Sequence, residues 1–215
     1  MKKAVSRMVR ADSPHRRSAA PQGSSRSAIV DAAEMLFLER GFGGVSVDEL
    51  AAAAGVARRT LYNHFDSKEQ IFAEVMSRMS ADLAQALPPA VETMGDVKTV
   101  LRLVAEAVLE FQTRADYRAL VSIVIAEGKQ FEWLRGEFAQ LNDPYLERFA
   151  RYLSFLTEGQ ILACANPDLA ARQFIGLFNE ALFWPTLMGQ SVTLGRQEVI
   201  DEAIGMFLLR YQGRS

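Results

Sequence analysis

The chain has 215 residues, a formal net charge of −2 and one cysteine, and 49% of its residues are hydrophobic. This length can bury a sizeable core in one domain or in two small ones. The single cysteine, Cys164, excludes an internal disulfide and a cysteine-based metal cluster, and it is typical of a reducing compartment. No apolar run approaches the roughly 20 residues that span a bilayer, and no apolar segment follows the basic N-terminus. We therefore expect a cytoplasmic protein without a membrane partner.

Charge is unevenly distributed along the sequence. Residues 1–78 hold 12 Lys and Arg against 9 Asp and Glu, whereas residues 79–215 hold 12 against 17. A basic first part and an acidic second part indicate that only one end of the protein meets a polyanion.

Residues 1–23 are polar and basic and are interrupted by Pro14, Pro21 and Gly23. They show no sustained helical stripe, so we predict a mobile basic arm. Either it is a plain tail, or it follows a phosphate backbone.

From Ser24 onward the pattern becomes helical. Ile29, Ala33, Leu36 and Phe37 fall on one face of a helix that ends at Gly41, a suitable left-handed cap.

A second and a third short helix follow. Ser46 and Glu49 have the spacing of a capping box, which opens a short helix that ends at Gly55. The stretch from Gly55 to Phe65, GVARRTLYNHF, then reads as a glycine turn and another short helix. Two short helices joined by a tight turn predict a helix-turn-helix. The spacing from Asp66 to Glu69 predicts another capping box at the start of the next helix.

The third helix is anchored on one side and polar on the other. At about 100° per residue, Leu61 and Phe65 share the core side, and Arg59 and Asn63 point the opposite way. The major groove of B-DNA, about 12 Å wide, admits one helix, in which arginine can bind guanine and asparagine can bind adenine. Hydroxyl groups and helix N-termini suit phosphate. A solvated surface helix is the alternative. The residues that we expect to contact DNA are Ser46, Val47, Arg58, Arg59, Thr60, Tyr62, Asn63, His64 and Lys68.

Beyond Lys68 the sequence is helical almost throughout, without a sustained alternation of period two. Breaks at Pro88-Pro89, Gly95, Asn142-Asp-Pro144, Asn166-Pro167 and Gly189 divide it. The predicted helices span 68–87, 96–113, 117–130, 132–141, 144–158, 167–184 and 196–210. The fold class is all-α, with an N-terminal three-helix domain that holds the helix-turn-helix and a larger helical domain behind it. We place the DNA-binding domain at 24–70 and the ligand-binding and dimerisation domain at 71–215.

The stretch AGVARRTLYNHFDSKEQIF is close to the signature of a known family. Residues 26–75 resemble the DNA-binding domain of the TetR family of bacterial transcriptional regulators. The C-terminal segment PDLAARQFIGLFNEALFWPTLMG resembles, less closely, the AefR-like subgroup.

The resemblance implies a homodimeric repressor that binds a palindromic operator and is released by a small molecule. It further implies that Thr60, Tyr62 and His64 meet DNA from the third helix and that Lys68 meets phosphate. One position departs from many relatives, because Ala57 stands where a serine or threonine could cap that helix. The missing cap costs about 1 kcal/mol of stability. Arg58-Arg59 also replaces a commoner pairing with glycine, which favours an operator richer in guanine.

An apolar cavity is plausible in the middle helices, which carry many aromatic residues and methionines. For each such residue a place in the core is the alternative. We expect a hydrophobic or weakly polar effector. The candidate lining residues are Met76, Arg102, Glu106, Phe111, Ile123, Glu127, Phe131, Trp133, Phe149 and Asn179.

The last two long helices are too apolar for helices that bury only one side, which favours a four-helix dimer interface over a simple core. The candidate interface residues are Phe174, Phe178, Leu182, Phe183, Ile200, Ile204 and Phe207.

Two other classes of protein compete with a ligand-controlled repressor. An enzyme is disfavoured because only His15 and His64 are present as histidines, Cys164 has no evident base, and no phosphate-binding loop or metal cluster appears. We expect no cofactor and no metal. An architectural DNA-binding protein would not need so large an acidic and apolar C-terminal part. Activation of transcription in place of repression remains open.

Overall fold

The computed structural model describes residues 22–87 and 96–213. Helices dominate these residues, and the only pairing of β type that they contain is one isolated bridge between Leu162 and Gln212. The all-α fold class is confirmed. Residues 1–21 of the predicted arm lie outside the described residues. Its last two positions, 22 and 23, belong to the first helix, which begins at Gln22. The predicted breaks at Pro88-Pro89 and Gly95 also lie outside them.

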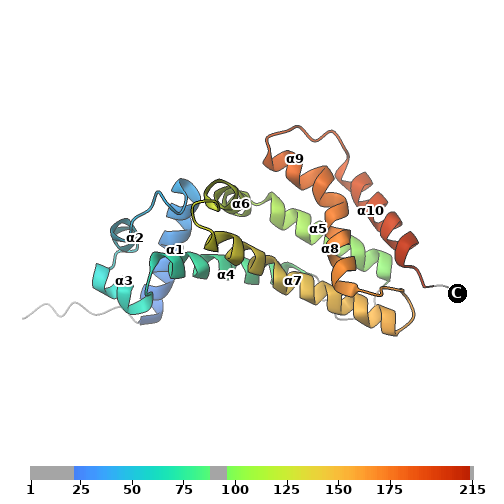
Figure 1. Ribbon diagram of the computed structural model, residues 1–215, viewed down its shortest axis with the longest axis horizontal. Helices are drawn as coiled ribbons and strands as arrows, with labels where there is room; N and C mark the ends of the chain where they lie inside the picture. Colours follow the sequence, from blue (N-terminus) through green and yellow to red (C-terminus); the bar gives the residue numbers. More distant parts are fainter. Residues whose placement is uncertain (1–21, 88–95, 214–215) are drawn as a thin grey trace, which may run out of the picture.

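The N-terminal part consists of α1 (Gln22–Arg40), α2 (Val47–Ala53) and α3 (Arg58–His64), which pack on one another at one end of the long axis (Figure 1). Their contact surface is apolar: Ile29, Phe37, Leu50 and Leu61 are fully buried. The helix-turn-helix that the sequence predicts is formed by α2 and α3.

Helix α1 ends as the sequence predicts. Gly41 has φ of +77°, in the left-handed region that favours glycine, and its N–H donates to the carbonyl of Phe37 over 2.8 Å. Phe42 then folds back, with its ring centroid 5.7 Å from that of Phe37. The chain therefore leaves α1 in a direction that buries Phe42.

The start of α2 and the turn to α3 also match the sequence. The N–H of Ser46 donates to Glu49 Oε2 over 2.8 Å, and the N–H of Glu49 donates to Ser46 Oγ over 3.3 Å, which completes the capping box. Gly55 makes the turn with φ of +65°. Ala57, the N-cap of α3, gives no side-chain hydrogen bond.

The C-terminal part is built around α4, which leaves the N-terminal helices and runs beside α7 (Figure 1). Helix α8 packs on α7, and α10 packs on both α8 and α5. The elements are α4 (Lys68–Ala86), α5 (Val97–Thr113), α6 (Ala115–Glu127), α7 (Trp133–Glu158), α8 (Pro167–Phe178), a π-helical turn η2 (Asn179–Phe183), α9 (Trp184–Leu187) and α10 (Arg196–Tyr211).

The predicted break before Pro144 is wrong, because α7 continues through it. A proline inside a helix removes one N–H donor and disturbs the preceding turn. Here Ser80 Oγ of α4 donates to the carbonyl of Leu141 over 2.9 Å, next to the disturbed turn. Tyr145 and Phe149 are buried, and α7 packs against both α4 and α8, so packing holds the helix together.

Two further details differ from the prediction. The cap of α4 is Ser67, whose side chain accepts from the N–H of Gln70, and Gln70 Oε1 accepts from the N–H of Asp66 over 2.6 Å. The predicted box from Asp66 to Glu69 is therefore one residue out of register. The predicted helix 167–184 is interrupted by η2, where the N–H of Trp184 bonds to the carbonyl of Asn179, five residues back.

Candidate DNA-binding surface and effector cavity

Helix α3 presents a free polar surface to solvent. Leu61 and Phe65 are buried beneath it, and Arg59, Asn63 and Tyr62 are exposed, with Tyr62 at 42%. Thr60 and His64 are half-buried at its borders. Because α3 lies at the end of the molecule beside α2 (Figure 1), a groove of DNA can approach these side chains.

Arg58 has partners on α2 and α3, whereas no partner of Arg59 is found among residues 22–87 and 96–213. One guanidinium nitrogen of Arg58 lies 2.9 Å from Asp48 Oδ1 and 3.0 Å from Asp48 Oδ2, and its guanidinium lies 5.6 Å from the Tyr62 ring centroid. Arg58 is thus oriented by α2 and Tyr62, whereas Arg59 is exposed, and its contact with a base stays a prediction.

The start of α2 is a closed hydrogen-bond ring. Ser46 uses both its N–H and its hydroxyl on Glu49, and these hydrogen bonds lower the pKa of the Glu49 carboxyl. A contact of Ser46 with phosphate would have to compete with that carboxylate. Val47 is half-buried against the core.

Lys68 is bound to the loop between α1 and α2. Its Nζ donates to the carbonyls of Phe42 and Val45, each over 2.8 Å, and it lies 4.1 Å from the Phe42 ring centroid. Burial lowers the pKa of Lys68. Its first role is to fix this loop, and a phosphate contact stays a prediction.

The turn between α6 and α7 docks onto the same loop. Glu127 Oε2 accepts from the N–H of Gly43 over 2.7 Å. The rings of Phe131 and Trp133 lie 5.0 Å and 4.9 Å from Phe42. The structure therefore places Glu127, Phe131 and Trp133 at the contact between the two parts of the chain, away from the cavities described below.

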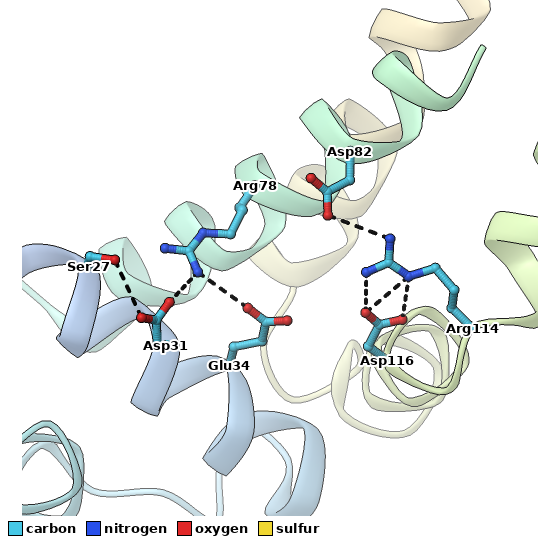
Figure 2. A network of polar contacts seen from close by, with 7 residues as sticks. All are labelled: Ser27, Asp31, Glu34, Arg78, Asp82, Arg114 and Asp116. Atoms are coloured by element: carbon cyan, nitrogen blue, oxygen red, sulfur yellow. Dashed lines mark hydrogen bonds and ion pairs between the residues drawn. The ribbon is translucent and has the colours of Figure 1, made fainter. Parts of the chain in front are cut away.

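A polar network joins the same two parts farther along α4 (Figure 2). Arg78 of α4 reaches Asp31 of α1 at 2.5 Å and Glu34 at 3.6 Å. Asp82 of α4 lies 3.6 Å from Arg114, which also pairs with Asp116 of α6 (Figure 2). Helix α4 therefore contacts both α1 and Arg114, the residue that precedes α6.

We expect Glu127→Ala to lower the free energy of unfolding by about 1 kcal/mol, because a charge-assisted hydrogen bond to Gly43 is lost at a partly exposed site. Urea denaturation followed by circular dichroism measures the change. Glu132→Ala, an exposed acid nearby, is the matched control and should leave stability within about 0.5 kcal/mol. Equal stability of both variants would contradict this role of Glu127.

One cavity of about 350 Å³ lies between α5, α6, α7, α8, η2 and α9. Asn179, one of the predicted lining residues, is on its wall, and Met76 lines a separate cavity of about 210 Å³ between α4 and α7. The wall residues of the larger of these two cavities are Gln112, Tyr117, Phe138, Tyr145, Leu146, Arg172, Ile175, Gly176, Asn179, Glu180, Phe183 and Trp184.

The other predicted lining residues lie elsewhere. Arg102 pairs with Asp201 of α10, and the carbonyl of Glu106 accepts from Arg196 over 3.1 Å. Phe111, Ile123 and Phe149 are buried in the core.

Most of the cavity wall was missed by sequence reasoning. Gln112 carried a usable signal, because it is a polar residue on the apolar stripe formed by Val104, Ala105 and Val108 of α5. The aromatic wall residues gave none, since aromatic side chains are as common in a core as in a pocket.

The predicted dimer residues are largely internal to one chain. Phe174, Phe178, Phe183, Ile200, Ile204 and Phe207 are buried, and Leu182 is half-buried. Phe174 lies 5.1 Å from Phe207 and 5.6 Å from Phe149, ring centroid to ring centroid. The opposite faces of α8 and α10 expose Leu169, Met206 and Leu209, and Leu177 beside them is half-buried.

Within the described ranges, no group of three or more His, Cys, Asp and Glu side chains is placed to hold a metal ion. No helix there is long and apolar enough to cross a bilayer.

Comparisons with known proteins match both the N-terminal helix-turn-helix part and the C-terminal helical part of the chain. Residues 29–75 match the model described as bacterial regulatory proteins, tetR family, and residues 99–213 match the AefR-like transcriptional repressor C-terminal domain. EthR of Mycobacterium tuberculosis (strain ATCC 25618 / H37Rv) is 25% identical over 205 residues, 93% of each chain. DhaR of Mycobacterium sp. (strain GP1) is 36% identical over 146 residues, 67% of this chain and 72% of the relative. The solved structure of the flavonoid-responsive regulator FrrA is 29% identical, with a TM-score of 0.79 over 90% of this chain and 100% of FrrA.

An exposed polar helix on a helix-turn-helix, joined to a larger helical domain with its own cavity, defines a DNA-binding transcriptional regulator. The chain belongs to the TetR family of bacterial regulators, and its C-terminal domain is of the AefR-like type.

Proposed function

We propose that this protein is a homodimeric repressor that binds a palindromic operator and is released from it by a small, mainly hydrophobic effector. The observation that carries the proposal is the surface of α3, where Arg59 and Asn63 are exposed above a buried anchor. The relative DhaR is named a transcriptional repressor, which supports this direction of control. A protein with this activity acts on DNA in the cytoplasm.

Activation is the second candidate, since FasR of Mycolicibacterium smegmatis, 33% identical over 91 residues, is named a transcriptional activator. Footprinting on the DNA that flanks the protein's own coding sequence, followed by transcription in vitro from that DNA, separates the two. Protection with a fall in transcript supports repression, and protection with a rise supports activation. The absence of any protected site would contradict control of its own promoter region.

A dimer would form through the outward faces of α8 and α10. Leu209 is 85% exposed and Met206 50% exposed on α10, and Leu169 is 49% exposed on α8. A shallow cavity of about 350 Å³ between the two helices extends this apolar surface. Two copies related by a two-fold axis could cover it mutually, and two copies of α3 would then reach two half-sites about 34–36 Å apart.

We expect the double variant Met206→Asp, Leu209→Asp to be a monomer, because two buried carboxylates would face an apolar surface without a partner. Sedimentation velocity measures the mass. Ile125→Asp, which changes a residue of α6 that is 56% exposed, is the control and should leave the dimer intact. A dimer that persists in the double variant would place the interface elsewhere.

Effector control follows from linkage between the cavity and the DNA. An effector must bind more tightly to the form whose two copies of α3 do not match the half-sites, and a coupling of 1–3 kcal/mol gives about 5- to 150-fold release. Helix α4 contacts α1 on one side and α7 on the other, so it is the element that we assign to carry the change. The description of FrrA as flavonoid-responsive supports a small-molecule effector.

A further inference from the structure

Positive charge is concentrated in the first 21 residues of the sequence. They hold six Lys and Arg against one Asp, whereas residues 22–78 hold six against eight and residues 79–215 hold 12 against 17. Residues 22–215 are therefore acidic as a whole, and the helix-turn-helix within them must nevertheless approach a polyanion. The six cations of the first 21 residues are Lys2, Lys3, Arg7, Arg10, Arg16 and Arg17.

Most arginines at the DNA-binding end already have acidic partners. Two guanidinium nitrogens of Arg26 donate to the carboxylate of Glu74, over 2.6 Å and 2.8 Å, and Arg40 lies 2.9 Å from Glu49. Exposed ion pairs are weak one by one, so phosphate could displace such a carboxylate. The displaced carboxylate would stay nearby and repel the phosphate. The arginines of residues 22–78 that are paired in this way are Arg26, Arg40, Arg58 and Arg78.

The two other cations of residues 22–78 are Arg59 and Lys68. Lys68 Nζ already donates to the carbonyls of Phe42 and Val45. Arg59 is exposed and has no partner among the described residues. Proteins that bind DNA commonly neutralise several phosphates, because each neutralised phosphate releases counterions and strengthens binding. One such arginine per protomer is too few for this role, so further cations must come from another part of the chain.

The first 21 residues join α1 beside the end of α3. Helix α1 begins at Gln22 and packs on α3 (Figure 1). About one turn after Gln22, the guanidinium of Arg26 lies 4.9 Å from the ring centroid of Phe65, the C-cap of α3. An extended chain of this length spans at most about 70 Å, roughly two turns of B-DNA. Its cations can therefore reach phosphates well beyond those beneath α3.

We propose that residues 1–21 are the main phosphate-binding element of the protein, and that their cations neutralise the backbone of double-stranded DNA beside the half-site that α3 reads. Phosphate contacts carry no sequence information, so α3 selects the site and residues 1–21 supply most of the electrostatic affinity. This inference rests on the proposed operator binding and adds a second DNA-binding element to it.

The salt dependence of DNA binding tests the proposal. The logarithm of the binding constant falls with the logarithm of the salt concentration, with a slope of about 0.9 for each neutralised phosphate. In the quadruple variant Arg7→Gln, Arg10→Gln, Arg16→Gln, Arg17→Gln we expect this slope to shrink by about 3 per protomer, and affinity at about 0.1 M salt to fall about 100-fold or more. Affinity for a random duplex should fall by a similar factor. Fluorescence anisotropy measures both.

Two controls separate this charge from other effects. Replacement of the same four arginines by lysine keeps the charge and should keep the wild-type slope, since lysine also binds phosphate. The double variant Lys98→Gln, Arg151→Gln removes two charges from exposed positions on α5 and α7 and should change the slope by less than about 0.5. Arg16→Gln, Arg17→Gln removes as many charges and should lower the slope by about 2. Circular dichroism checks that each variant keeps its helices.

An unchanged slope in the quadruple glutamine variant would overturn the proposal, and so would equal losses in the two double variants. If the wild-type protein binds a specific site and the quadruple variant binds it equally well, the proposed function stands and residues 1–21 are a plain tail. If the wild-type protein selects no site but the quadruple variant loses affinity for a random duplex with the expected slope, residues 1–21 bind phosphate and the proposed function fails.

Discussion

The double variant Arg59→Ala, Asn63→Ala is expected to lose specific binding to its operator. Both side chains are exposed on α3, and the anchor beneath them is Leu61 and Phe65. A side chain that reads a base edge contributes about 1–3 kcal/mol, so each substitution should weaken specific binding by about 5- to 150-fold. Fluorescence anisotropy at two salt concentrations measures the loss, with a scrambled duplex alongside. Affinity for the scrambled duplex should fall much less.

The control for this variant is Arg151→Ala, which removes the same charge from an exposed position on α7. Its operator affinity should stay close to that of the wild-type protein. Equal losses in the two proteins would mean that overall charge, and not the surface of α3, determines binding. The melting temperatures of both variants should match the wild-type value, since neither substitution touches the core.

Phe42→Ala is expected to have the largest effect on stability. Phe42 is 1% exposed, and its ring centroid lies between 4.9 Å and 5.7 Å from those of Phe37, Phe72, Phe131 and Trp133. Truncation of a buried phenylalanine costs about 3–5 kcal/mol. Because Phe42 joins the DNA-binding helices to the turn before α7, the variant should also bind its operator more weakly. Chemical denaturation measures the free energy of unfolding.

Phe155→Ala is the matched control, since Phe155 is 46% exposed on α7. It should change the free energy of unfolding by much less than Phe42→Ala. If Phe42→Ala lowers stability by less than about 1 kcal/mol, the contact around Phe42 does not hold the two parts of the chain together.

The DNA-binding end could be predicted in detail because its signals are local. Gly41, the capping box from Ser46 to Glu49 and Gly55 each act within one turn of chain, and each is found where the sequence places it. The exposed and buried faces of α3 follow from helical periodicity alone.

The remaining features depend on tertiary contacts. Pro144 predicts a break, but α7 continues because α4 and α8 pack along it and Ser80 bonds to Leu141. No sequence pattern near Asn179 predicts the π-helical turn η2. Phe131 and Trp133 look like pocket residues in the sequence, but in the structure they pack on Phe42, which is about 90 positions earlier in the chain.

The apolar residues of α8 and α10 also show that sequence alone does not tell buried from exposed positions. Phe174 and Phe207 are buried inside one chain, whereas Met206 and Leu209 on the same helix as Phe207 are exposed. Hydrophobicity identifies both sets, and only the packing tells which of them faces outward.

We propose above all that α3 reads a specific, two-fold symmetric DNA site. Selection from a randomised double-stranded DNA library, carried out with the wild-type protein and with the Arg59→Ala, Asn63→Ala variant, tests it most directly. We predict that the wild-type protein enriches an inverted repeat whose half-site centres lie one helical turn or a multiple apart, and that the variant does not. No enriched sequence with the wild-type protein, or the same repeat with both proteins, would contradict it.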